Sequence, residues 1–115
     1  MSHGGRYLVL WLGLAAPACR PKEAPGPPVA TDHVTLPASY RFTPAAITVT
    51  AGTRVTWVNA DHFTHSVRLV EDGGGDLRMR PGDSVSFVFQ TPGLHHYDCA
   101  VHRQAMRGTV LVTAP

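Results

Sequence analysis

The sequence predicts an all-β domain, a small β-sandwich or barrel, on the basis of three observations. Apolar and polar residues alternate in short runs from about Thr35 onward. Gly, Pro, Asn and Asp residues divide these runs, and no stretch after residue 18 shows helical periodicity. Alternating runs separated by turn residues are typical of strands that bury one face. We therefore expect one folded domain over residues 35–115.

The alternating runs also predict the core. Turns are expected at Ala51-Gly52, at 72–76, at Pro81-Gly82-Asp83 and at Thr91-Pro92-Gly93. The apolar residues between these turns would share one buried face, since side chains on a strand alternate between two faces. The predicted core consists of Ile47, Val49, Val55, Trp57, Val67, Leu69, Met79, Val85, Phe87, Phe89, Tyr97, Cys99, Val110 and Val112.

Length and composition restrict the classes of protein that are possible. A chain of 115 residues has room for one small domain. Charged residues make up 16% and hydrophobic residues 43%, which is not the composition of a disordered chain. Ten basic residues stand against eight acidic ones, and the arginines are scattered along the chain. Nucleic-acid binders normally concentrate basic residues in one stripe, so this class is excluded.

The N-terminus has the pattern of an export signal. Arg6 precedes an apolar run over residues 7–16, which is too short for a comfortable membrane span. Ala16-Pro17-Ala18 then supplies small residues of the kind that a signal peptidase accepts. We interpret residues 1–18 as a signal peptide, with an uncleaved anchor helix or a buried core helix as the alternative.

Cys19 directly follows this segment and begins a stretch, residues 19–34, that is rich in proline near its start. An apolar run followed by small residues and Cys resembles a bacterial lipoprotein signal, although Ala16 stands where Leu is preferred and Pro17 is unusual. The resemblance implies a lipidated Cys19 and attachment through acyl chains, whereas an ordinary signal peptide before a cysteine is the alternative. Residues 19–34 would form an extended tether. We expect an exported protein, in the periplasm or on the outer face of a membrane.

The candidate metal ligands gather near the C-terminus. Cys99, His102 and Met106 follow one another closely between two predicted strands, and His65 lies on an earlier predicted turn. Soft sulfur ligands together with imidazole select copper, and two His, one Cys and a weak axial Met form the blue-copper arrangement. The only other cysteine is Cys19, which belongs to the N-terminal segment, so no disulfide framework is expected.

Each of these residues also has an ordinary structural interpretation. A lone buried Cys is usually a small hydrophobe, and a lone Met at a strand entrance usually packs. The order Cys-x-x-His-x-x-x-Met with an upstream His favours a metal site over these readings taken together. His62 would make a zinc-like pair with His65, but we interpret it as an exposed loop residue. His95 shares the inward parity of Cys99 and His96 does not, and neither is expected to be a ligand.

Two segments resemble the cupredoxin family, in particular its plastocyanin and amicyanin branch. The first carries Asn-x-Asp-x-x-x-His-x-Val, at Asn59, Asp61, His65 and Val67. The second segment carries the family's Cys-x-x-His and the Met-x-Gly-x-Val that follows it, and the matching residues are Gly93, Tyr97, Cys99, His102, Met106, Gly108 and Val110. In addition, the run from Phe42 to Gly52 fits the family's opening strands. The resemblance covers roughly residues 38–113. It departs from the family at His95, where an aromatic residue is usual, and at Ser66, where Asn commonly follows the histidine.

The resemblance implies a small Greek-key β-sandwich with one type 1 copper ion. His65, Cys99 and His102 would be the equatorial ligands and Met106 a long axial partner. The His102 ring edge would be the electron port. The protein would be a monomer that works with redox partner proteins as donor and acceptor.

Three functions from different classes follow from these residues. The first is a single-electron carrier, which needs no substrate pocket. The second is a copper oxidase or nitrite reductase, but such enzymes resemble several fused domains with extra copper centres, and this chain has one domain and one ligand set. We therefore do not expect an enzyme. The third is a copper or zinc binding and delivery module that uses the same ligands without redox turnover.

Overall fold

The computed structural model describes residues 26–101 and 106–115, and every regular element in them is a β-strand. The strands are β1 (Val29–Ala30), β2 (His33–Leu36), β3 (Ala46–Thr50), β4 (Thr53–Asn59), β5 (His65–Leu69), β6 (Asp76–Met79), β7 (Ser84–Phe89), β8 (Gly93–Asp98) and β9 (Arg107–Thr113). The all-β fold class predicted from the sequence is confirmed. No helix long and apolar enough to cross a bilayer occurs in these described ranges.

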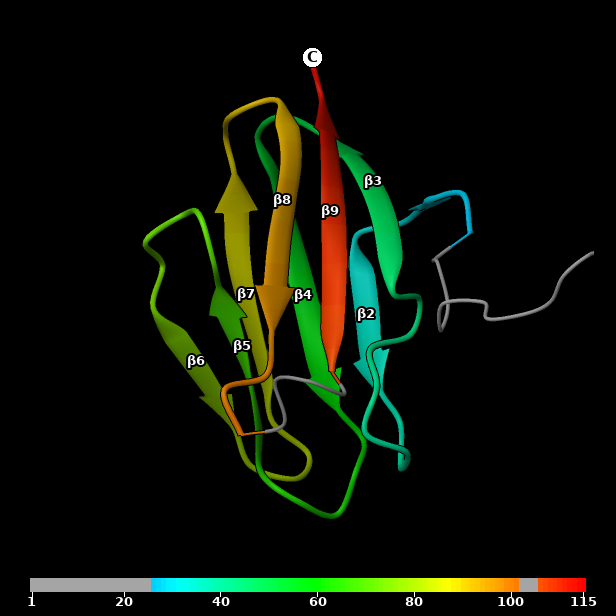
Figure 1. Ribbon diagram of the computed structural model, residues 1–115, viewed down its shortest axis with the longest axis vertical. Coiled ribbons are helices and arrows are strands. Elements are labelled where there is room, and N and C mark those ends of the chain that lie inside the picture. The colour runs from blue at the N-terminus through cyan, green and yellow to red at the C-terminus, as the bar shows by residue number, and fades with distance from the viewer. Residues whose placement is uncertain (1–25, 102–105) are drawn as a thin grey trace, which may run out of the picture.

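The strands form two layers that face one another (Figure 1). One sheet has the order β1-β3-β9-β8-β5-β6, and the second has the order β2-β4-β7. Consecutive strands repeatedly change sheets, as from β4 to β5 and from β7 to β8. The loops that join these strands therefore cross from one sheet to the other, and loops from different segments lie close together at the ends of the sandwich.

The core lies between the two sheets and holds the inward side chains of both. In β4, for example, Val55, Trp57 and Asn59 are buried, and the residues between them are more exposed. Trp57 packs edge-on against the Tyr97 ring at 5.2 Å between ring centroids, which joins the smaller sheet to β8. Burial of these apolar side chains is the main driving force for the fold.

Most of the predicted core is buried as expected, with two differences in β7. Val85 and Phe87 are only partly buried and pack against the core from its margin. Both belong to a strand at the edge of the three-stranded sheet, where covering by the opposite layer is incomplete. Two buried residues of β2, Val34 and Leu36, were not predicted.

The sheets begin before Thr35, where the alternating sequence pattern placed the start of the fold. β1 pairs in parallel with β3, and β2 pairs in parallel with β4. These are short strands, and β1 exposes both of its residues, so their sequences carry little periodicity. β6 was missed for a similar reason, because it follows the Gly-rich turn at once and has only four residues.

The predicted signal peptide, residues 1–18, and Cys19 lie outside the described residues. So does the part of the predicted tether that precedes residue 26. Cys99 is a free, buried thiol.

Candidate metal centre

Three of the four predicted ligands lie at one end of the sandwich. His65 is the first residue of β5, Cys99 directly follows β8, and Met106 directly precedes β9. All three are fully buried. The backbone N–H of Cys99 donates to the carbonyl of Met106 at 3.2 Å, so these two residues lie side by side. His102 lies outside the described residues.

The structure brings His65 and Cys99 together from segments 34 residues apart. The Nδ1 atom of His65 lies 3.8 Å from the Sγ atom of Cys99. β5 and β8 are neighbours in the larger sheet, so sheet pairing delivers both side chains to the same place. An imidazole nitrogen and a thiolate sulfur at this separation are suitably placed to share one metal ion.

Contacts between side chains of β5 and the residues that flank Cys99 tie these two segments together. Arg68 of β5 donates from Nε and Nη2 to the carboxylate of Asp98, at 2.9 and 2.7 Å. The hydroxyl oxygen of Ser66 accepts a hydrogen bond from the N–H of Ala100 at 3.0 Å. Two-point contacts of the Arg–carboxylate kind fix orientation as well as distance. The ligand-bearing ends of β5 and β8 are therefore held in register.

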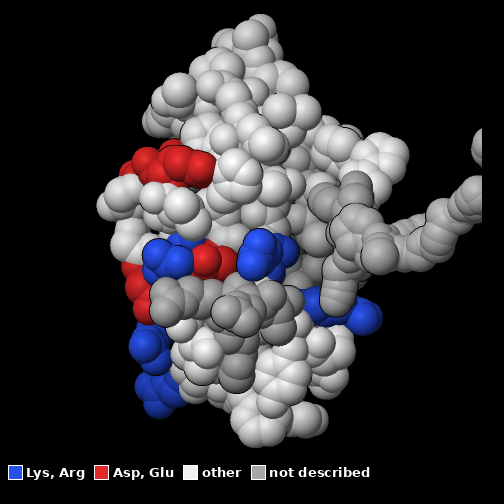
Figure 2. Space-filling view, viewed as in Figure 1, with Lys and Arg blue, Asp and Glu red and all other residues white. Residues whose placement is uncertain are grey.

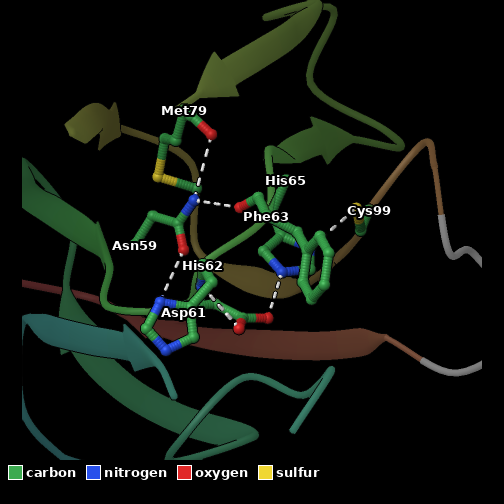
Figure 3. A network of polar contacts seen from close by, with 7 residues as sticks. All are labelled: Asn59, Asp61, His62, Phe63, His65, Met79 and Cys99. Carbon is green, nitrogen blue, oxygen red and sulfur yellow. Dashed lines mark hydrogen bonds and ion pairs between the residues drawn. The ribbon is translucent and has the colours of Figure 1, made fainter. Parts of the chain in front are cut away.

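The loop from Asn59 to His65 is organised by one buried amide (Figure 3). Asn59 donates from Nδ2 to the carbonyls of Phe63 and Met79, at 2.8 and 3.0 Å. Its Oδ1 accepts from the N–H of Asp61 at 2.9 Å. The side chain thus replaces backbone pairing that a tight loop cannot make for itself.

Asp61 contacts the far side of the His65 ring. Its Oδ2 lies 2.7 Å from Nε2 of His65, and its Oδ1 accepts from the N–H of His62 at 2.7 Å. The hydrogen bond to His65 holds the pKa of the Asp61 carboxyl below its usual value. Asp61 is therefore ionised at neutral pH.

Aromatic rings cover His65 on the solvent side. Tyr40 meets the imidazole edge-on at 5.7 Å between ring centroids and stacks on Phe63 at 5.9 Å. Tyr40 has a φ of 51°, which is uncommon for a residue other than glycine. Tyr40 and Phe63 are themselves exposed, so they form an apolar rim next to the buried ligand.

Gly108 explains a further position of the predicted motif. A Cβ atom at this residue would overlap the phenol ring of Tyr97, on the neighbouring strand β8. The close approach of β9 to this ring requires glycine two residues after Met106.

Three further histidines, His62, His95 and His96, lie as predicted from the sequence. His62 is exposed in the loop, His95 is buried and His96 points outward. His95 contacts Asp72 and the carbonyl of Thr91 and is not part of the site. Within the described ranges no group of three His, Cys, Asp or Glu side chains converges.

The comparisons with known proteins agree with this geometry. The family model described as copper binding proteins, plastocyanin/azurin family, matches residues 33–113. This chain belongs to that family. Members of this family are cupredoxins, and the family is described as copper-binding. The imidazole of His65, the thiol of Cys99 and the thioether of Met106 are donors of the kind that copper prefers.

Individual cupredoxins show how close the likeness is. The chain is 36% identical to plastocyanin of Scenedesmus fuscus over 83 residues, covering 62% of this chain and 85% of that protein. It is 29% identical to amicyanin-alpha of Methylorubrum extorquens over 80 residues, covering 65% of this chain and 66% of that protein. A purple cupredoxin from Nitrosopumilus maritimus superposes with a TM-score of 0.64 at 23% identity, covering 72% of this chain and all of that one.

Proposed function

We propose that this cupredoxin is a type 1 copper protein that carries single electrons between redox partner proteins. The observation that carries the proposal is the buried approach of His65 Nδ1 to Cys99 Sγ, at 3.8 Å, from the start of β5 and the end of its neighbour β8. His65, Cys99, His102 and Met106 would hold the metal. Bound copper would supply a one-electron couple.

The chain's own part in this function is to keep the ligands still. The Arg68–Asp98 ion pair and the Ser66–Ala100 hydrogen bond lock the two ligand segments to one another. A site that is held in place by its surroundings needs little rearrangement when its charge changes, which favours rapid electron transfer. The burial of Cys99 keeps water and oxidants from the thiolate.

Absorption and paramagnetic resonance spectra of the copper-loaded full chain test this proposal. We expect an intense visible band from thiolate-to-Cu(II) charge transfer, which bleaches on reduction and returns on reoxidation. Cys99→Ser should abolish the band, because the hydroxyl cannot replace the thiolate. Cys99 is fully buried and belongs to the core, so circular dichroism of the variant serves as the folding control.

Two results would contradict the carrier proposal. A persistent blue band in Cys99→Ser would exclude Cys99 as the source of the colour. A colourless Cu(II) form of the unmodified chain would instead favour a binding and delivery module without redox turnover.

We further propose that the protein acts outside the cytoplasm as a monomer without enzymatic turnover, with no nucleic acid among its partners. The signal-like residues 1–18 and the position of Cys19 support export and a lipid anchor. The balance of ten basic and eight acidic residues agrees with the exclusion of nucleic acid, and both signs of charge occur on the face in Figure 2. Mass spectrometry of the exported protein would detect the acyl chains on Cys19, and an unmodified Cys19 would exclude the anchor.

A further inference from the structure

A buried carboxylate stands directly behind the proposed copper ligand His65. Asp61 is 5% exposed and His65 is fully buried, and 2.7 Å separates Oδ2 from Nε2. Burying a charge is costly unless it is paired and hydrogen-bonded, so a carboxylate at this position requires a partner that compensates for its loss of water. The imidazole of His65 provides its charge-assisted partner.

Asp61 is itself fixed at three points. Its backbone N–H is held by Asn59, its Oδ1 is held by the N–H of His62, and its Oδ2 meets His65 (Figure 3). Asn59 is in turn anchored to two backbone carbonyls. The carboxylate therefore has one position, and the ring of His65 takes its orientation from it.

This contact also selects the tautomer of His65. An ionised carboxylate only accepts hydrogen bonds, so the proton of the neutral imidazole resides on Nε2. The lone pair of Nδ1 is then directed toward the side of the ring where Cys99 lies. A ring N–H bound to a carboxylate is also a stronger electron donor through its other nitrogen.

We propose that Asp61 is a positioning residue that orients His65 and, through its negative charge, favours Cu(II) over Cu(I) and so lowers the reduction potential of the site. This inference rests on the proposed function, because it requires copper at His65. Cu(II) carries one more positive charge than Cu(I), and a nearby anion stabilises the more highly charged ion more strongly.

The test uses the full chain with Asp61→Asn and Asp61→Ala. Asparagine retains an oxygen that accepts from Nε2 but removes the charge. We expect the affinity for Cu(II) relative to Cu(I) to fall about tenfold, which corresponds to a rise in potential of about 59 mV. Alanine also removes the orienting bond, so Cu(II) affinity should fall further, within the range of about 10–100-fold.

Asp72→Asn is the matched control, because Asp72 contacts a buried histidine in the same way. Its partner His95 lies four residues before Cys99 on an extended strand, about 13 Å away along β8. The control removes the same charge from the protein, so a shift equal to that of Asp61→Asn would overturn the proposal by showing a non-specific charge effect.

A second readout needs no copper. Nitrogen NMR of the metal-free protein should find the His65 proton on Nε2 in the unmodified chain and in Asp61→Asn, and a mixture of tautomers in Asp61→Ala. An unchanged potential in Asp61→Asn together with an unchanged tautomer in Asp61→Ala would overturn the inference. A chain that forms no blue site but loses the tautomer preference in Asp61→Ala would contradict the carrier function and keep the orienting role.

Discussion

Two buried histidine–carboxylate pairs lie near opposite ends of β8, and they differ in what their second ring nitrogen meets. Asp61 binds His65 at 2.7 Å, and Asp72 binds His95 at 2.9 Å. In His95 the other nitrogen, Nε2, lies 2.7 Å from the carbonyl of Thr91. In His65 the other nitrogen faces the Cys99 sulfur.

This difference separates a structural ion pair from a candidate ligand. Both neighbours of the His95 ring are hydrogen-bond acceptors, so the ring needs a proton on each nitrogen. Burial of the His95 ring works against its charge, but the hydrogen bonds to Asp72 and Thr91 outweigh it and raise the pKa of His95. A histidine with two protons has no lone pair for a metal. The partner of the second nitrogen therefore decides the role of a buried histidine, and the Asp–His contact alone does not.

The largest expected effect comes from replacing each histidine by glutamine. His65→Gln should lose the charge-transfer absorption, because a ligand is removed and the loss exceeds the about 10–100-fold that outer partners cost. His95→Gln should keep the absorption. Spectra of the copper-loaded variants measure both. If His95→Gln loses its colour while its circular dichroism is unchanged, the distinction between His65 as a ligand and His95 as a structural residue is wrong.

A smaller effect is expected from Asp72→Asn, on the free energy of unfolding. The variant leaves the His95 charge with a neutral partner in a site where the two side chains are 10% and 17% exposed. Hydrogen bonds to charged groups contribute about 1.5–3 kcal/mol, so a loss of up to about 3 kcal/mol is expected in denaturant titrations. Asp76→Asn is the control, because the carboxylate of Asp76 lies 3.8 Å from Arg78 at the surface. Equal free energies of unfolding for the two variants would show that the Asp72–His95 pair stabilises the fold no more than the surface pair of Asp76 and Arg78.

The sequence predicts one of these pairs better than the other. His65 is found by its motif, and the inward parity of His95 follows from alternation along the strand that ends before Cys99. The partner of His95 could not be predicted, because Asp72 lies 23 residues away and reaches the ring through the turn between β5 and β6. Asp61 stands in the motif, but spacing alone does not reveal that its carboxylate turns back onto the ring of His65.

The fold shows the same limit. Long alternating runs such as β4 predict both strand and buried face, because each residue contributes to the pattern. Short edge strands such as β1 and β6 depend on a neighbouring strand for their hydrogen bonds, and a neighbour is not visible in the local sequence. The approach of β9 to the Tyr97 ring likewise becomes clear only from the structure, which explains why Gly108 is needed.

The smallest expected effect is a dependence of stability on pH that belongs to His95. Its pKa in the folded protein is raised above the ordinary value of about 6.5. The folded state therefore binds the proton more tightly than the unfolded state. The resulting stabilisation is fully present below about pH 6.5 and is lost as the pH rises through the raised pKa.

Denaturant titrations of the unmodified chain and of His95→Gln, in the same metal state at several pH values, measure this contribution. The difference in unfolding free energy should be largest in mild acid and shrink as the pH rises above about 6.5. If the fold binds the proton about tenfold more tightly than the unfolded chain, the difference shrinks by about 1.4 kcal/mol. His33→Gln is the matched control, because its pair with Asp32 is 66% and 55% exposed and solvent screens it. A difference that stays constant with pH would mean that the pKa of His95 is the same in the folded and unfolded states, so that the fold does not stabilise its charge. The contrast with His65 would then no longer rest on charge.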